Sequence, residues 1–186
     1  MKLKDVIILS AGLLGLNDVV SVLDNKMAEN EYTSPIIERL RTLSNIVTNE
    51  LSSGYLPLER IDDVKVVNKK ISLTALQKRP IKILQVFDYN GKSIEFTYDA
   101  TTIYLEEVQN VKVKYNYVAE NYKLTDDVGY TEQSISRVVL AYGVCAEYCL
   151  TERRFDEAVM WHQRFVDGVK NKIMPKNVKT GSRRWQ

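Results

Sequence analysis

The sequence predicts an α+β fold: an antiparallel α-helical bundle with an inserted small antiparallel β domain and an extended basic C-terminal tail. Apolar residues recur at helical spacing before residue 57 and after residue 122, and they alternate with polar residues between those limits. The last residues carry positive charge without any apolar period. We therefore expect four segments: N-terminal helices (1–56), the β domain (57–122), a C-terminal helical hairpin (123–174) and the tail (175–186).

The first segment shows helix start and stop signals. A helix over 3–14 is expected to stop at Gly15, and residues 18–26 allow a further helical turn. Ser34 suits an N-cap and the following proline suits the first helical position, so the long helix is expected over 35–52.

The second segment changes to the alternating pattern of strands. Its clearest turn contains Gly91, which supplies a positive φ between two alternating runs. Strands are expected at 64–66, 70–73, 80–87, 94–98, 103–105 and 111–117.

The C-terminal hairpin is the pattern around which the chain is organised. One apolar stripe runs from Ile135 to Cys149, and after a polar break at 151–154 a second stripe follows. Because so short a connection makes two helices antiparallel neighbours, we expect the stripes to be buried against each other. The second stripe comprises Phe155, Val159, His162, Phe165, Val166, Val169 and Ile173.

Side chains with reactive potential are assigned to the core. Cys145 and Cys149 lie four residues apart on an inward face and are expected to be reduced. His162 is the single histidine and is expected to be an interior or groove residue. The chain lacks a glycine-rich phosphate loop and a nucleophile elbow. We therefore expect no catalytic residues, no metal and no cofactor.

Acidic pairs and tyrosines are expected to have structural roles. The pairs at 62–63, 106–107 and 126–127 are expected to be solvated or capping residues, the last at the start of the major helix. Tyrosines gathered in or beside the β domain favour core or subunit-interface positions, although aromatic side chains on strands also stack bases. They are Tyr89, Tyr98, Tyr104, Tyr115, Tyr117 and Tyr122.

Charge is divided unevenly along the chain. The net charge is +2, and the residues after Val169 carry six positive charges and no acid, so the preceding part carries −4. This asymmetry predicts that the tail docks on an acidic partner surface or on phosphate, whereas the body does not attract nucleic acid. The predicted docking residues are Lys176, Lys179, Arg183, Arg184 and Trp185.

The N-terminus allows one other interpretation. Lys2 and Lys4 precede an apolar run over 6–16, as in a short signal peptide, but Asp5 interrupts the basic part and no small-residue cleavage motif follows. No run approaches the roughly 18 apolar residues of a membrane span, so no membrane association is expected.

Several short motifs, taken in order with the element pattern, resemble the head-to-tail connector (adaptor, or head completion) proteins of tailed bacteriophages. They are Asp5-Val6-Ile7 with Leu13-Leu14-Gly15, Ala146-Glu147-Tyr148, Phe155-Asp156-Glu157-Ala158 and the final Arg-Arg-Trp. The resemblance implies a structural virion protein that joins capsid to tail. It implies a homo-oligomeric ring, usually of about twelve copies, below the portal protein, with the helical bundle lining the DNA channel.

The same resemblance implies the partners and the location. The tail inserts into the portal protein, a tail-side neck or tail protein binds below, and genomic DNA passes without specific binding. The protein is expected in the virion neck, after assembly in the host cytoplasm. Two alternatives remain: a nucleic-acid-binding module that uses the basic tail and the tyrosine-bearing strands, and a related tail-completion protein.

Overall fold

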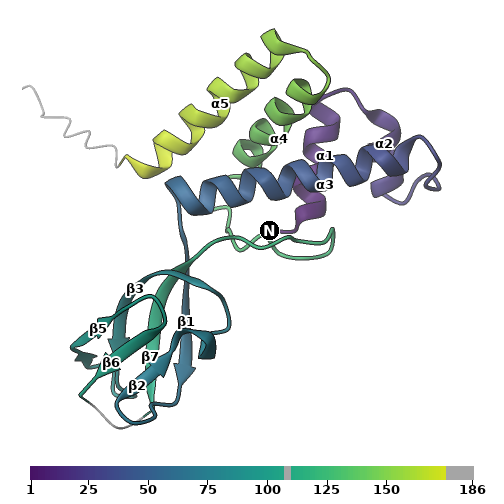
Figure 1. Ribbon diagram of the computed structural model, residues 1–186. Coiled ribbons are helices and arrows are strands. Elements are labelled where there is room, and N and C mark those ends of the chain that lie inside the picture. The colour runs from purple at the N-terminus through teal and green to yellow at the C-terminus, as the bar shows by residue number, and fades with distance from the viewer. Residues whose placement is uncertain (107–109, 175–186) are drawn as a thin grey trace, which may run out of the picture. The chain divides into compact units, whose positions relative to one another are not determined.

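The computed structural model describes residues 1–106 and 110–174. It confirms an α+β fold, with five α-helices and two antiparallel sheets in the described part of the chain (Figure 1). The chain divides into two compact units. The helical unit comprises Met1–Ser44 and the described residues from Lys123 onward, and the β unit comprises Asn45–Tyr122.

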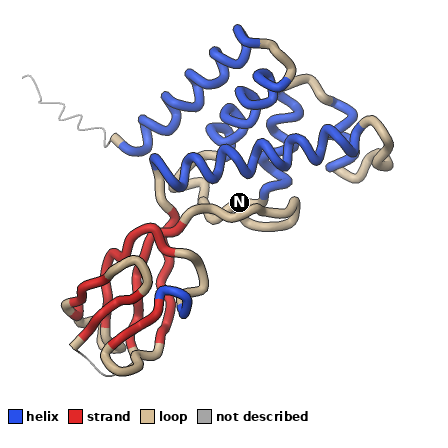
Figure 2. The backbone as a smooth tube through the Cα atoms, viewed as in Figure 1, coloured by secondary structure: helices blue, strands red, loops and turns tan. Residues whose placement is uncertain are grey.

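The helical unit is built around its fourth helix. It contains α1 (Leu3–Leu13), α2 (Asn17–Leu23), most of α3 (Thr33–Glu50), α4 (Arg137–Thr151) and α5 (Phe155–Ile173), drawn in blue in Figure 2. Both α1 and α5 pack against α4. Apolar residues of α4 are therefore buried around most of its circumference. These include Leu140, Ala141, Val144, Cys145, Ala146, Tyr148 and Cys149.

Both ends of α3 differ from the predicted ones. Asn30 caps α3, because its side-chain oxygen accepts from the backbone N–H groups of Tyr32 and Thr33 at 2.9 and 3.0 Å. Ser34, the predicted cap, already lies inside the helix. At the other end α3 stops at Glu50, and the chain continues through a π-helical turn, η1 (Leu51–Tyr55), instead of ending at about residue 52.

The acidic pair at 126–127 lies beside α1 and not, as predicted, at the start of α4. The carbonyl oxygen of Asp126 accepts from the N–H of Leu3 at 3.0 Å, so this pair lies at the start of α1. The first turn of α4 is capped instead by Ser136, whose hydroxyl oxygen accepts from the N–H of Val138 at 3.2 Å. The prediction failed because the segment before α4 returns to the N-terminus of α1 before it begins the helix.

The rotation of α5 also differs from the prediction. Its buried residues are Ala158, Trp161, Phe165 and Val169, whereas Phe155, Val159 and His162 are exposed. Gly168 explains the choice of face. A Cβ atom at Gly168 would lie only 2.6 Å from Cγ2 of Val139, so the absence of a side chain lets α5 approach α4 along this face.

An aromatic stack reinforces the same contact. The rings of Tyr142 on α4 and Trp161 on α5 are stacked with centroids 5.5 Å apart. The guanidinium carbon of Arg164 lies 4.9 Å from the Trp161 centroid and 5.8 Å from the Tyr142 centroid. Stacking and cation–π attraction therefore both favour the observed rotation of α5.

The β unit holds two antiparallel sheets around one core. One sheet has the order β1-β7-β3-β4 and the other β2-β6-β5 (red in Figure 2). The strands are β1 (Leu58–Val64), β2 (Lys70–Ser72), β3 (Pro80–Phe87), β4 (Ser93–Ile94), β5 (Phe96–Tyr98), β6 (Thr102–Leu105) and β7 (Val111–Tyr117), with a 3-10 turn, η2 (Leu73–Ala75), after β2. The shared core includes Val64, Ile71, Ile83, Val86, Ile103, Val111, Val113 and Tyr115.

The first strand begins six residues earlier than predicted. β1 pairs with β7 along its whole length, from Leu58 opposite Tyr117 to Val64 opposite Val111. Asp62 lies inside this strand and is only 4% exposed, so the prediction that it is a solvated or capping residue is wrong. Charged residues at 59, 60, 62 and 63 obscured the alternation that identifies a strand.

A polar ladder closes the base of the β unit. Asn45 donates from its side-chain nitrogen to the carbonyl oxygen of Tyr122 at 3.1 Å and accepts from the Tyr122 N–H at 2.8 Å. Asn49 donates to the carbonyl oxygen of Ala119 at 3.3 Å, and the hydroxyl oxygen of Ser52 accepts from the Ala119 N–H at 2.8 Å. These side chains therefore tie the segment that leads into β1 to the segment that follows β7.

Gly168→Ala is expected to lower the free energy of unfolding by about 1–3 kcal/mol, because the added methyl group overlaps Val139 in a packed contact. The matched control is Gly12→Ala in α1, where a Cβ atom meets nothing within 4 Å. That change is expected to stabilise the protein by about 0.5–1 kcal/mol. Urea unfolding followed by far-ultraviolet circular dichroism measures both. If Gly168→Ala has the same free energy of unfolding as the wild type, Val139 moves aside and this glycine does not set the rotation of α5.

Candidate interaction surface

One face of α5 leaves a row of apolar side chains uncovered. Phe155 is 62% exposed, Val159 is 70% exposed and Ile173 is 44% exposed. His162 is exposed and Val166 is half-buried. These five residues, which we call the α5 seam, follow helical spacing along the full length of the helix. The seam is a mainly apolar surface that the described chain leaves largely uncovered.

Charged residues border the seam at both ends of α5, acidic residues at its start and basic residues at its end. The first turn of α5 contains Asp156 and Glu157, and the last turn contains Lys170 and Lys172. Glu157 is already engaged, because its Oε1 accepts from Nε of Arg154 at 2.7 Å. This hydrogen bond raises the pKa of Arg154 above its ordinary value. Each end of α5 therefore carries the charge that complements the helix dipole.

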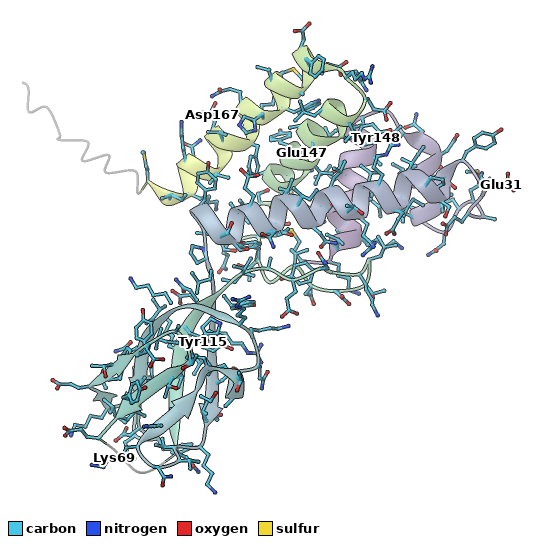
Figure 3. All side chains as sticks on the ribbon, viewed as in Figure 1. Glu31, Lys69, Tyr115, Glu147, Tyr148 and Asp167 are labelled. Carbon is cyan, nitrogen blue, oxygen red and sulfur yellow. The ribbon has the colours of Figure 1, made fainter. Side chains whose placement is uncertain are left out.

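The middle of the border is polar. Gln163 donates from Nε2 to Oδ1 of Asp167 at 2.9 Å, and Figure 3 labels Asp167 on α5. Lys172 donates to the carbonyl oxygen of Gln133 at 3.2 Å. Within the described residues, no ion pair joins Asp156 or Lys170 to another side chain. These two charges are thus available to another molecule.

The residues predicted to dock the tail lie outside the described part of the chain. They are Lys176, Lys179, Arg183, Arg184 and Trp185, all beyond residue 174. The described chain nevertheless shows where this segment is attached. α5 ends at Ile173 with two lysines in its last turn, so the basic sequence continues directly from the end of the α5 seam.

The β unit contains a buried carboxylate that sequence reasoning missed. Oδ1 of Asp62 accepts from Nε of Arg60 at 2.7 Å, and Oδ2 accepts from the hydroxyl of Tyr115 at 2.6 Å and the N–H of Gln77 at 2.8 Å. The Tyr115 oxygen in turn accepts from the N–H of Lys78 at 3.1 Å. Figure 3 labels Tyr115 in this unit.

The pKa values of Asp62 and Tyr115 indicate that this network has a structural role. Burial alone would raise the pKa of Asp62, but hydrogen bonds from Tyr115, Gln77 and Arg60 together hold it below its ordinary value. Burial, with the hydrogen bond to Asp62, raises the pKa of Tyr115 to about 12. Neither group exchanges a proton near neutral pH. The network instead fastens the loop before β3 to β1 and β7.

The structure confirms the prediction that Cys145 and Cys149 are core residues. Both are buried and free of disulfides, and Sγ of Cys145 donates to the carbonyl oxygen of Ser10 at 3.7 Å. Burial raises the pKa of the Cys145 thiol to about 12, and burial also raises the pKa of Cys149. Both therefore stay in the thiol form, which is a poor nucleophile.

The tyrosines of the β unit divide into two groups. Tyr115 is fully buried, whereas Tyr89, Tyr98 and Tyr104 are 57%, 45% and 37% exposed. The Tyr104 hydroxyl donates to Asp99 at 2.8 Å and so holds the turn between β5 and β6. The amino group of Lys112 lies 5.7 Å from the centroid of the Tyr89 ring. The amino group of Lys70 likewise lies 5.4 Å from the centroid of the Tyr104 ring, so Tyr89 and Tyr104 are both exposed aromatic side chains with an adjacent cation.

Neither a metal-binding cluster nor a membrane-spanning helix occurs in the described residues. Within residues 1–106 and 110–174, no three side chains of the histidine, cysteine, aspartate or glutamate type gather in an arrangement that could hold a metal ion. In the same part of the chain, none of the helices combines the length and apolar character needed to cross a bilayer.

Comparison with known proteins gives no assignment. No protein-family model matches the chain, and no curated protein sequence shows significant similarity to it. Any functional interpretation therefore depends on the residues and surfaces described above.

Asp62→Asn is expected to lower the free energy of unfolding by about 1–3 kcal/mol at pH 7, because it removes a buried, hydrogen-bonded charge beside Arg60. Asp63→Asn, at the exposed neighbouring position, is the control and is expected to change little. Urea unfolding at several pH values measures both, with amide hydrogen exchange at Val113 reporting on the β unit.

The pH dependence gives a second readout. Because the pKa of Asp62 is lower in the folded state, its stabilisation is complete above the unfolded pKa of about 3.9 and is lost as the pH falls through the folded value. The difference in free energy of unfolding between the wild type and Asp62→Asn should therefore become smaller at acidic pH. A gap that stays constant down to pH 2 would contradict this assignment.

Proposed function

We propose that this chain is a head-to-tail connector (adaptor) of a tailed bacteriophage, a structural virion protein rather than an enzyme. It forms a ring below the portal, joins the capsid to the tail and lines the DNA channel. The observation that carries the proposal is the C-terminal hairpin: α5 exposes an apolar seam and runs directly into the basic tail.

The order of elements supports this proposal. Helices precede and follow a β unit whose first and last segments are tied together by Asn45, Asn49 and Ser52. A helical unit with such an insertion is the arrangement that the resemblance to connector proteins implies. A β unit that closes on itself can be added to a helical unit without disturbing its core.

The exposed surface of α5 and the charge of the chain support the binding partners that we propose. An exposed apolar row such as the α5 seam marks a protein-interaction site, which fits a homo-oligomeric ring in contact with the portal protein and a tail-side neck or tail protein. Residues up to Val169 carry a net charge of −4, which suits a channel through which genomic DNA passes without specific binding. The location that we propose is the virion neck, with assembly in the host cytoplasm.

A nucleic-acid-binding module is the second candidate, and one observation favours it. Tyr89 is exposed beside the amino group of Lys112, an arrangement that stacks bases and contacts phosphate. A tail-completion protein would share the surfaces of a connector and differ in its neighbour. DNA affinity that falls steeply with salt would favour the nucleic-acid-binding module.

Deletion of residues 176–186 is expected to abolish co-sedimentation with portal rings from the same source, because it removes Trp185 and four of the positive charges. Thermal melting should stay unchanged, since the deletion begins beyond α5. Trp185→Ala combined with Arg183→Ala and Arg184→Ala is expected to give the same loss.

The control for docking is Arg153→Ala, which removes an exposed positive charge from the α4–α5 connection. It should dock as wild type does. If the truncated chain docks with unchanged affinity, the tail is not the anchor and the connector proposal loses its main support.

Assembly on portal rings is expected to weaken as salt rises. Charged side chains between neighbouring helical hairpins attract over a Debye length that falls from about 10 Å at 0.1 M salt to about 3 Å at 1 M. Negative-stain images of portal complexes at both salt concentrations measure the occupied fraction. Equal occupancy would exclude an electrostatic contribution to the ring.

A further inference from the structure

The α5 seam has the spacing of a two-helix contact. Its residues Phe155, Val159, His162 and Val166 follow one another at intervals of four, three and four, and the buried Val169 and exposed Ile173 continue the series. Alternating steps of three and four residues place side chains along one line that a second helix can cover. Within the described chain, α4 packs against the adjacent face of α5, where Val169 is buried, and leaves the rest of this line half-buried or exposed.

The charges beside the seam indicate which helix covers it. Asp156, Gln163 and Lys170 are spaced seven residues apart, so they occupy equivalent positions on one border of the seam. The order along the helix is acid, amide, base. When a second α5 is turned end for end, Asp156 faces the partner's Lys170 and Gln163 faces the partner's Gln163.

The parallel orientation does not bring these charges together. In a parallel pair, residues of this border face the partner's other border, so Asp156 meets neither the partner's Lys170 nor the partner's Asp156. Neither Asp156 nor Lys170 forms an ion pair within the described residues, so both are available for a contact between copies. The seam is thus self-complementary in the antiparallel orientation alone.

We propose that the free protein pairs with a second copy of itself through the α5 seams, antiparallel, with the two-fold axis passing beside Gln163. This goes beyond the proposed ring. A contact in which both copies use the same surface closes on itself, whereas a ring requires each subunit to use two different surfaces. Subunits paired in this way must therefore separate before the same seam can take part in the proposed ring.

Light scattering during size-exclusion chromatography of the full chain tests the proposal. The wild type is expected at twice its 21.4 kDa mass in the micromolar range and to dissociate on dilution. Val159→Lys places a charge in the seam and should raise the dissociation constant at least about tenfold. Val67→Lys is the matched control, because Val67 is a 59% exposed valine of the β unit.

Charge reversal tests the orientation. Asp156→Lys and Lys170→Asp should each weaken the pair, because each places like charges opposite one another, and the double variant should restore it. In a parallel pair neither residue faces the partner's Asp156 or Lys170, so the single variants would leave the dissociation constant unchanged. Circular dichroism verifies folding of each variant. If a charge variant unfolds, Gln163→Cys serves instead, since an added thiol oxidant such as diamide should give a disulfide across the axis while Cys145 and Cys149 remain buried.

Three results would overturn the proposal. They are a wild type of 21.4 kDa at all concentrations, a species larger than two chains, and a pair that Val159→Lys leaves intact. Failure of the folded double variant to recover, or of Gln163→Cys to cross-link, would exclude the antiparallel orientation. These measurements use no portal rings, so their failure leaves the docking of the tail a separate question.

Discussion

The polar ladder at the base of the β unit is the constraint on which the two-unit organisation depends. Asn45, Asn49 and Ser52 lie on successive turns at the end of α3 and its π-helical extension. Together they satisfy backbone groups of Ala119 and Tyr122, the residues that follow β7. An insertion is tolerated only when its two ends are held close, and here side chains provide that closure. Asparagine suits the task because one amide both donates and accepts.

The sequence patterns predicted where the helices and strands lie better than which face of each one is buried. The α+β class, the long helix before the β unit, the C-terminal hairpin and the buried cysteines all follow from local periodicity. α5 was different because it carries two neighbouring apolar rows. The row with the clearer spacing is exposed, and the buried row is selected by Gly168 against Val139 and by Trp161 against Tyr142. Such partner-dependent choices are absent from the spacing of a single helix.

The buried network shows the same limit at longer range. Asp62 stands among charged neighbours and looks like a surface residue, yet its hydrogen-bond partner Tyr115 is 53 positions away. Only the pairing of β1 with β7 brings the two together. For the candidate surface, composition identified the basic tail and its attachment after the hairpin. The uncovered seam became visible only when the packing of α5 was known.

The pairing of β1 with β7 has a mechanical consequence. These strands are the first and last of the β unit, and Leu58, where β1 starts, lies opposite Tyr117, where β7 ends. Tension applied through the two connecting segments would therefore load the ladder bonds of Asn45 and Ser52 first and then peel β1 from β7 one residue pair at a time. Sequential peeling resists far less force than shearing a whole strand pair at once. The two ends of the β unit thus emerge at the same end of one strand pair, the geometry in which a pull separates the residue pairs in turn.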